Sequence, residues 1–127
     1  MKEQGFGHIV NTSSAAGHGP SPVSAAYSTT KHAVVGLLHY EAEEFGIKVS
    51  TLCPAFVDTP IFGKAKAINI DKNVIQKQLK KQKMMTPEKL VKITLDGVHN
   101  NKPIICPMPM RKTMDIVFAM IPLYTML

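Results

Sequence analysis

One tyrosine and one lysine stand four residues apart in the segment SAAYSTTKHA, as Tyr27 and Lys31. In a helix, such positions share a face, so both side chains would act on one small volume. An ammonium close to a phenol favours the phenolate, which accepts a proton. This is the chemistry of a general acid–base that interconverts a carbonyl and an alcohol. The spacing alone is weak, because roughly 0.3 such pairs are expected by chance in this composition, and a plain helix surface explains it equally well.

Two serines precede this pair and offer a hydrogen bond to a substrate oxygen. Ser13 and Ser14 end the segment GHIVNTSS, whose β-branched apolar run predicts a buried strand. The carboxyl ends of parallel strands are where α/β folds place such groups. A hydroxyl there would stabilise negative charge as it develops on the substrate oxygen.

The elements that position these residues alternate between strand and helix. Gly46 and Thr86–Pro87 are the clearest punctuation, as a helix stop and as a helix start with its N-cap. The expected elements are a serine strand 7–14, a Tyr/Lys helix 25–45, a strand 47–53, a substrate-lid segment 59–85, a helix 86–100, a strand 102–107 and a terminal helix 111–121. This alternation predicts an α/β fold with a doubly wound, Rossmann-type parallel sheet. Three strands make a thin sheet, so we expect one partial domain over residues 1–127.

Composition narrows the class of protein. The chain has 127 residues, 45% of them hydrophobic, and a net charge of +6, which is typical of one globular domain. Seven lysines lie within residues 64–83, but arginine and aromatic residues are absent there, so a solvated helix face is favoured over a nucleic-acid surface. Cys53 and Cys106 have no metal-binding or redox spacing, and they favour a reducing compartment such as the cytoplasm, as small buried hydrophobes. No metal site is expected.

The C-terminal segment MDIVFAMIPLYTML is the most apolar part of the chain. It has 14 residues and is interrupted by Pro122, which is too short for a membrane-spanning helix of about 20 residues. A packed terminal helix is the simpler interpretation. An anchor at a membrane surface, assisted by the lysine-rich segment, is the alternative.

Read in order, these blocks closely resemble the short-chain dehydrogenase/reductase family. The family shows a strand of the type G-x-I-V-N-x-S-S-x-x-G, a Y-x-x-x-K helix and a following strand that ends in P-G-x-V-x-T. Here the corresponding segments are GHIVNTSSAAG, Tyr27 with Lys31, and GIKVSTLCPAFVDT. The resemblance covers essentially the whole chain and is most specific over residues 5–61. It implies an oxidoreductase that uses NAD or NADP to interconvert a carbonyl and a secondary alcohol.

The resemblance also implies roles for single residues. Tyr27 matches the catalytic acid–base, Lys31 the residue that assists it and binds the nicotinamide ribose, and Ser14, rather than Ser13, the serine that orients the substrate oxygen. The loop that holds the nicotinamide end of the cofactor is matched by Pro54, Val57 and Thr59. Without the resemblance, Thr59 would be an ordinary turn residue before Pro60. The family glycine after the proline is Ala55 here, which adds a methyl group near the ring.

Several family features are missing from this sequence. It contains no G-x-x-x-G-x-G turn, on which the family rests the cofactor pyrophosphate, and no N-N-A-G stretch. We therefore expect the C-terminal catalytic half of a family member, which would bind NAD(H) or NADP(H) weakly or not at all by itself. An exposed sheet edge would favour homo-oligomers.

Two functions follow as expectations. The first is a dehydrogenase/reductase acting on a small carbonyl or alcohol substrate. The apolar residues of the lid segment suggest an apolar substrate, although core contacts explain them equally well: Ile61, Phe62, Ile68, Ile70, Met84 and Met85. The second is a catalytically silent fragment or interaction module that cannot bind the cofactor alone.

Overall fold

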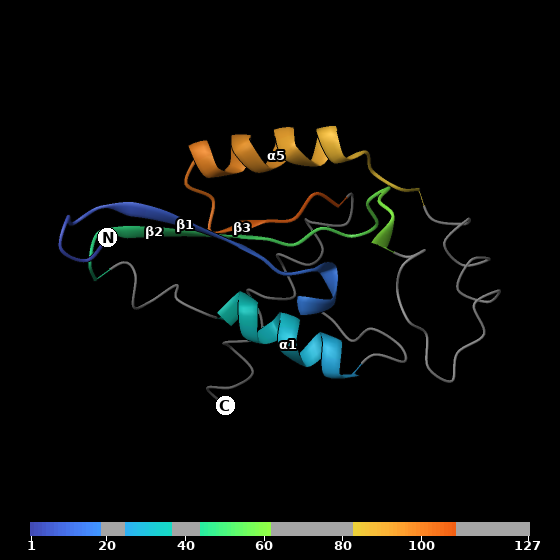
Figure 1. Ribbon diagram of the computed structural model, residues 1–127, viewed down its shortest axis with the longest axis horizontal. Helices are drawn as coiled ribbons and strands as arrows, with labels where there is room; N and C mark the ends of the chain where they lie inside the picture. The colour runs from blue at the N-terminus through green and yellow to red at the C-terminus, as the bar shows by residue number, and fades with distance from the viewer. Residues whose placement is uncertain (19–24, 37–43, 62–82, 109–127) are drawn as a thin grey trace, which may run out of the picture.

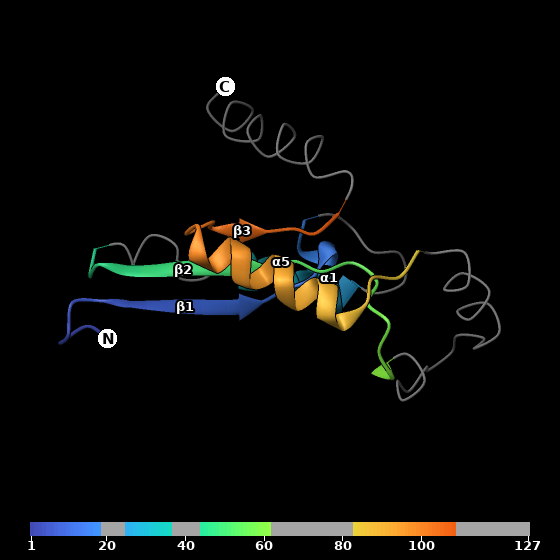
Figure 2. The same ribbon diagram turned by 90° about the horizontal axis from the view of Figure 1, so that it is seen from above.

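Among the residues that the structure describes, three parallel strands form a sheet with a helix on each face. A computed structural model describes residues 1–18, 25–36, 44–61 and 83–108. Strands β1 (Gly7–Thr12), β2 (Ile47–Leu52) and β3 (Ile104–Ile105) lie side by side in that order (Figure 2). Helices α1 (Ala25–Gly36) and α5 (Pro87–His99) cover opposite faces of the sheet (Figure 1). The predicted α/β fold with a parallel, Rossmann-like sheet is confirmed.

The two faces of the sheet can be assigned from two contacts. Ser13 donates its hydroxyl proton to the Lys31 carbonyl in α1, and a Cβ at Gly97 in α5 would meet Ile105 Cδ1 at 2.6 Å. Side chains alternate along a strand, and paired positions of neighbouring strands share a face. Every second residue counted from Ser13, and the residues paired with these, therefore face α1. Those counted in the same way from Ile105 face α5.

Strand β2 lies at the centre of the sheet and carries the core. It pairs with β1 through Gly7↔Ile47 to Thr12↔Leu52, and with β3 through Thr51↔Ile104 and Leu52↔Ile105. Ile47 and Val49 are buried and pack with Ile9 of β1. Five of its six residues are buried, on both faces of the sheet, as is typical of a central strand in a parallel sheet.

The buried hydroxyl of Ser50 links β2 to β1 and to the chain just before β3. Ser50 donates to the Lys102 carbonyl at 2.7 Å, and His8 Nε2 lies 2.8 Å from the same Ser50 oxygen. Because the hydroxyl has a single proton, the imidazole must donate to it, so His8 carries its proton on Nε2.

Helix α5 begins and ends as its sequence predicts. Thr86 is the N-cap, and its side chain accepts from the Lys89 amide at 3.3 Å. At the other end, the amides of Asn101 and Lys102 donate to the carbonyls of Val98 and Gly97, in the pattern of a Schellman motif. Asn101 takes φ +52, a left-handed conformation that asparagine tolerates.

Several predicted boundaries were wrong, by a few residues each. The serine strand ends at Thr12 rather than 14, because the chain turns there into the short helix η1 (Ala15–Gly17). The strand expected over 47–53 ends at Leu52. The strand expected over 102–107 is only two residues long, since prolines at 103 and 107 have no N–H for a ladder.

The predicted helices can be compared with the structure where their residues are described. The helix expected over 86–100 spans Pro87–His99. The Tyr/Lys helix begins at Ala25 as expected and is described to Gly36. Residues 44–46 form a turn, not helix, and Gly46 takes φ +67, which glycine reaches without strain.

The terminal helix 111–121 and most of the lid segment 59–85 lie outside the described residues, as does most of the lysine-rich stretch. Among the described residues, no helix is long and apolar enough to cross a bilayer.

Candidate active site

Tyr27 and Lys31 lie one turn apart near the start of α1. The Lys31 ammonium is 5.7 Å from the centroid of the Tyr27 ring, within the range of a cation–π contact. The tyrosine side chain is 47% exposed. A phenol that faces solvent beside an ammonium is accessible to a substrate oxygen without any rearrangement of the core.

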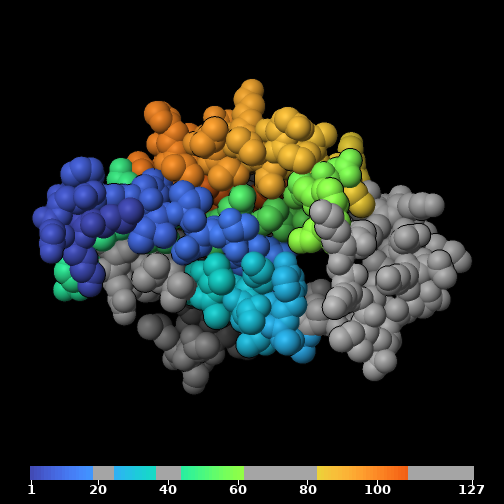
Figure 3. Space-filling view, viewed as in Figure 1, coloured from blue at the N-terminus to red at the C-terminus, as the bar shows by residue number. Residues whose placement is uncertain are grey.

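The lysine is also held by the sheet. Its Nζ donates to the carbonyl of Thr12, the last residue of β1, at 3.1 Å. An ammonium has three donors, so this bond uses one of them and leaves others for a ligand or the tyrosine. The helix that carries the pair is thereby fixed to the carboxyl end of β1, and their surfaces adjoin in Figure 3.

The two serines have different partners. Ser13 is buried, and its hydroxyl donates to the Lys31 carbonyl at 2.7 Å. Ser14 is partly exposed and is the N-cap of η1, where its oxygen accepts from the Ala16 amide at 3.2 Å. The Ser14 oxygen therefore keeps its proton for another acceptor, while the Ser13 proton is already used inside the fold.

Gly17 permits the close approach of η1 to α1, a role that the sequence prediction missed. A Cβ at this position would lie 2.5 Å from Ser13 Oγ, 2.8 Å from the Lys31 carbonyl oxygen and 3.0 Å from a Val35 methyl. The first two distances are shorter than real Cβ contacts, and the third is tighter than nine in ten of them. The glycine that closes the S-S-x-x-G pattern is the signal in the sequence for this close approach.

The loop after β2 meets the serine turn. The Ala15 amide donates to the Pro54 carbonyl at 2.9 Å, which joins the carboxyl ends of β1 and β2. Further along, Val57 forms a parallel bridge with Met85. Thr59, two residues later, is exposed. Of the predicted cofactor residues, the structure therefore brings Pro54 next to the serine turn and holds Val57 against Met85.

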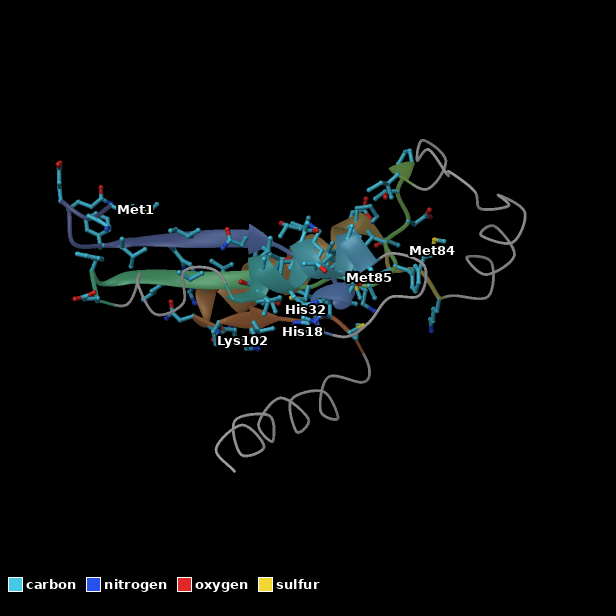
Figure 4. The ribbon with its side chains drawn as sticks, turned by 90° about the horizontal axis from the view of Figure 1, so that it is seen from below. Met1, His18, His32, Met84, Met85 and Lys102 are labelled. Carbon is cyan, nitrogen blue, oxygen red and sulfur yellow. The ribbon has the colours of Figure 1, made fainter. Side chains whose placement is uncertain are left out.

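Met85 is a second residue whose place the sequence did not indicate. Its amide donates to the Phe56 carbonyl and its carbonyl accepts from the Asp58 amide, both at 2.9 Å. Met84 and Met85 lie at the carboxyl-terminal end of the sheet, at the opposite end of the molecule from Met1 (Figure 4). Met85 therefore anchors the loop through its backbone.

Comparison with known proteins starts from a sequence model described as short chain dehydrogenase, which matches residues 1–69. An ipsdienol dehydrogenase of the beetle Ips pini is 43% identical over 68 residues, a match that covers 51% of this chain and 27% of that enzyme. A D-beta-hydroxybutyrate dehydrogenase of Rhizobium meliloti is 40% identical over 67 residues, 50% of this chain and 26% of the enzyme. These matches therefore span about a quarter of the relatives' length.

Solved structures match a larger part of the chain. A short-chain dehydrogenase/reductase from Burkholderia phymatum in complex with NAD has a TM-score of 0.74 and 26% identity, over 98% of this chain and 51% of its own. A short-chain dehydrogenase from Sphingobium yanoikuyae in complex with NADPH has a TM-score of 0.75 and 27% identity, over 93% of this chain and 44% of its own. The helices and strands described above thus occur together in enzymes that bind either nicotinamide dinucleotide.

Proposed function

The chain belongs to the short-chain dehydrogenase family, and from this premise we propose that it acts as an NAD(P)-dependent oxidoreductase with Tyr27 as its general acid–base. The reaction is the interconversion of a small carbonyl compound and a secondary alcohol. The observation that supports it most is the Lys31 ammonium, held 3.1 Å from the Thr12 carbonyl beside an exposed tyrosine. Cys53 and Cys106 are not joined in a disulfide, which is compatible with a cytoplasmic enzyme.

In this proposal, each residue handles the substrate oxygen or the proton. In the reductive direction, Tyr27 donates its phenolic proton to the carbonyl oxygen as that oxygen becomes an alkoxide. Lys31 stabilises the phenolate that remains, because a nearby opposite charge favours the charged form. Ser14 donates its hydroxyl proton in a hydrogen bond to the same oxygen, where negative charge develops.

The nicotinamide end of a dinucleotide fits the residues present. Lys31 has donors beyond its bond to Thr12, and they suit the ribose hydroxyls. The backbone from Pro54 to Thr59 borders the same end of the sheet and suits the ring. A bound nicotinamide would supply or accept the hydride. Since the sequence has no glycine-rich G-x-x-x-G-x-G turn, it offers no comparable cradle for the pyrophosphate.

A turnover assay with the purified chain tests the proposal. Because the chain has no G-x-x-x-G-x-G turn and should bind the dinucleotide weakly, we expect oxidation of NADH or NADPH only at high dinucleotide concentration, followed by its absorbance, in the presence of apolar ketones and aldehydes, and the reverse reaction with secondary alcohols. A fluorescence titration of each dinucleotide runs in parallel. Dinucleotide binding without any turnover across the panel would contradict the assigned chemistry.

A second function is an interaction module that binds no dinucleotide by itself. It is favoured by β1, which pairs only with β2 among the described strands and leaves Phe6 68% and Val10 44% exposed. Such an edge favours homo-oligomers or pairing with another chain. No change in the fluorescence titration, combined with concentration-dependent association in sedimentation, would support this function over the first.

Alanine variants of the two serines should impair different properties, kcat in one and stability in the other. Ser14→Ala should lower kcat about tenfold, because one hydrogen bond to the charged transition state is lost. Ser13→Ala should lower the free energy of unfolding by about 1–3 kcal/mol, because it leaves the Lys31 carbonyl without its buried donor. Kinetics and urea unfolding of both variants are the measurement. Equal losses of kcat in the two variants would show that the choice of Ser14 was wrong.

A further inference from the structure

Cys53 and Cys106 lie directly opposite each other, just beyond the ends of β2 and β3. The Thr51 amide donates to the Pro103 carbonyl and the Cys53 amide to the Ile105 carbonyl, both at 2.8 Å. In a parallel ladder, when the amide of residue i donates to the carbonyl of residue j−1 on the neighbouring strand, residues i and j are paired. The first bond reproduces the pair Thr51↔Ile104. The second therefore pairs Cys53 with Cys106, although 53 positions separate them in the sequence.

The same rule extends the row to the serine strand. The Ser13 amide donates to the Leu52 carbonyl at 2.8 Å, which pairs Ser13 with Cys53. Paired positions of neighbouring strands share a face. Ser13, Cys53 and Cys106 thus form one row across the sheet, on the face covered by α1, and Ser13 is bonded to the carbonyl of Lys31.

The two thiols also interact electrostatically. Burial raises the pKa of the Cys53 thiol to about 12, and the neighbouring Cys106 adds to the rise, against opposing effects of Ser13 and Lys31. Within the part of the chain that the structure describes, no group of three or more potential metal ligands exists. Two opposed thiols are the pair that a disulfide requires.

We propose that Cys53 and Cys106 are a modification site, and that they form a reversible disulfide within one chain when a hydroperoxide oxidises the protein. Neighbouring strands lie about 4.7–4.9 Å apart, which falls within the Cα separation of about 4.4–6.8 Å that disulfides require. Cys106 lies outside the regular strand, between β3 and Pro107, so its backbone can adjust to the S–S geometry.

The exposure of the two thiols sets the order of the steps. Cys106 is partly exposed and Cys53 is fully buried, so the hydroperoxide meets Cys106 first. The Cys106 sulfur attacks the peroxide oxygen and becomes a sulfenic acid, and the O–O bond breaks to release water or an alcohol. The Cys53 sulfur then attacks the Cys106 sulfur, and its proton leaves with the hydroxyl group as water. Two thiols lose two electrons in total, and one peroxide gains them.

The disulfide would act on the site through Pro54. Cys53 precedes Pro54, whose carbonyl accepts from the Ala15 amide in the serine turn. A covalent tie in this row restrains the loop that follows β2 and the anchor of Lys31. This regulatory effect rests on the proposed function, whereas formation of the bond does not.

Intact-mass measurement of the full chain after treatment with hydrogen peroxide tests the proposal. We expect the mass to fall by two hydrogen atoms, both thiols to become unreactive towards maleimide after denaturation, and dithiothreitol to reverse both changes. Closure should accelerate as the pH rises above neutral, because the raised pKa of Cys53 keeps its thiolate scarce at neutral pH. The readout is independent of turnover, so it separates this proposal from the proposed function.

Single-cysteine variants supply the controls. In Cys53→Ala, the Cys106 sulfenic acid should persist and react with dimedone, and in Cys106→Ser the buried Cys53 should stay reduced. Circular dichroism shows whether each variant is folded. The proposal is overturned if the folded wild-type chain keeps both thiols, gains separate oxygen adducts on each, or forms only disulfides between two chains on a non-reducing gel.

Discussion

Replacing Tyr27 with phenylalanine should lower kcat for carbonyl reduction by about 10²–10⁴-fold, the usual contribution of a general acid–base. Phenylalanine keeps the ring and removes only the proton that the reaction transfers. Because Tyr27 is 47% exposed, and its side chain has a ring contact with Lys31 alone among the described residues, stability should change by less than about 0.5 kcal/mol. Steady-state kinetics and thermal unfolding of the variant measure both quantities.

Thr29→Ala is the matched control for this substitution. Its hydroxyl is exposed on the same helix and donates only to the Ala25 carbonyl, at 2.9 Å. Its kcat should equal that of the wild type. If Tyr27→Phe keeps its full kcat while remaining folded, the phenol does not transfer the proton, and the proposed mechanism fails. A rise in KM alone would indicate that the phenol binds substrate equally in the ground and transition states.

Replacing Gly17 with alanine should lower the free energy of unfolding by about 1–3 kcal/mol, which is the usual effect of overpacking. The new methyl group would lie 2.8 Å from the Lys31 carbonyl oxygen, a backbone atom that cannot rotate away. The η1 turn must therefore move from α1, and with it Ser14 relative to Tyr27. We expect kcat to fall together with stability. Urea unfolding with a constant m-value measures the loss.

Gly36→Ala, at the end of the same helix, is the control. A Cβ there meets nothing within 4 Å. Alanine restricts the unfolded chain more than glycine does, so this variant should be slightly more stable than wild type, by about 0.4–1 kcal/mol. Equal destabilisation of both variants would mean that the contact of η1 with α1 is not what makes Gly17 necessary.

The parts of the fold that depend only on residues close together in the sequence were predictable. Hydrophobic periodicity, Gly46 and the Thr86–Pro87 start located the helices and strands, because these signals act over a few residues. The end of β1 was not, since it depends on whether a partner strand continues. The strand after α5 is short because of the prolines at 103 and 107, which the sequence shows directly.

The sequence by itself determined the α/β alternation and the juxtaposition of Tyr27 with Lys31, because an i, i+4 pair meets wherever a helix forms. Only the tertiary structure decided what lies across the sheet from what. It placed the Ser13 hydroxyl on the Lys31 carbonyl, required glycine at position 17, and set Cys53 opposite Cys106. The physical reason is that strand register is set by hydrogen bonds between segments far apart in the chain, and no local spacing records them.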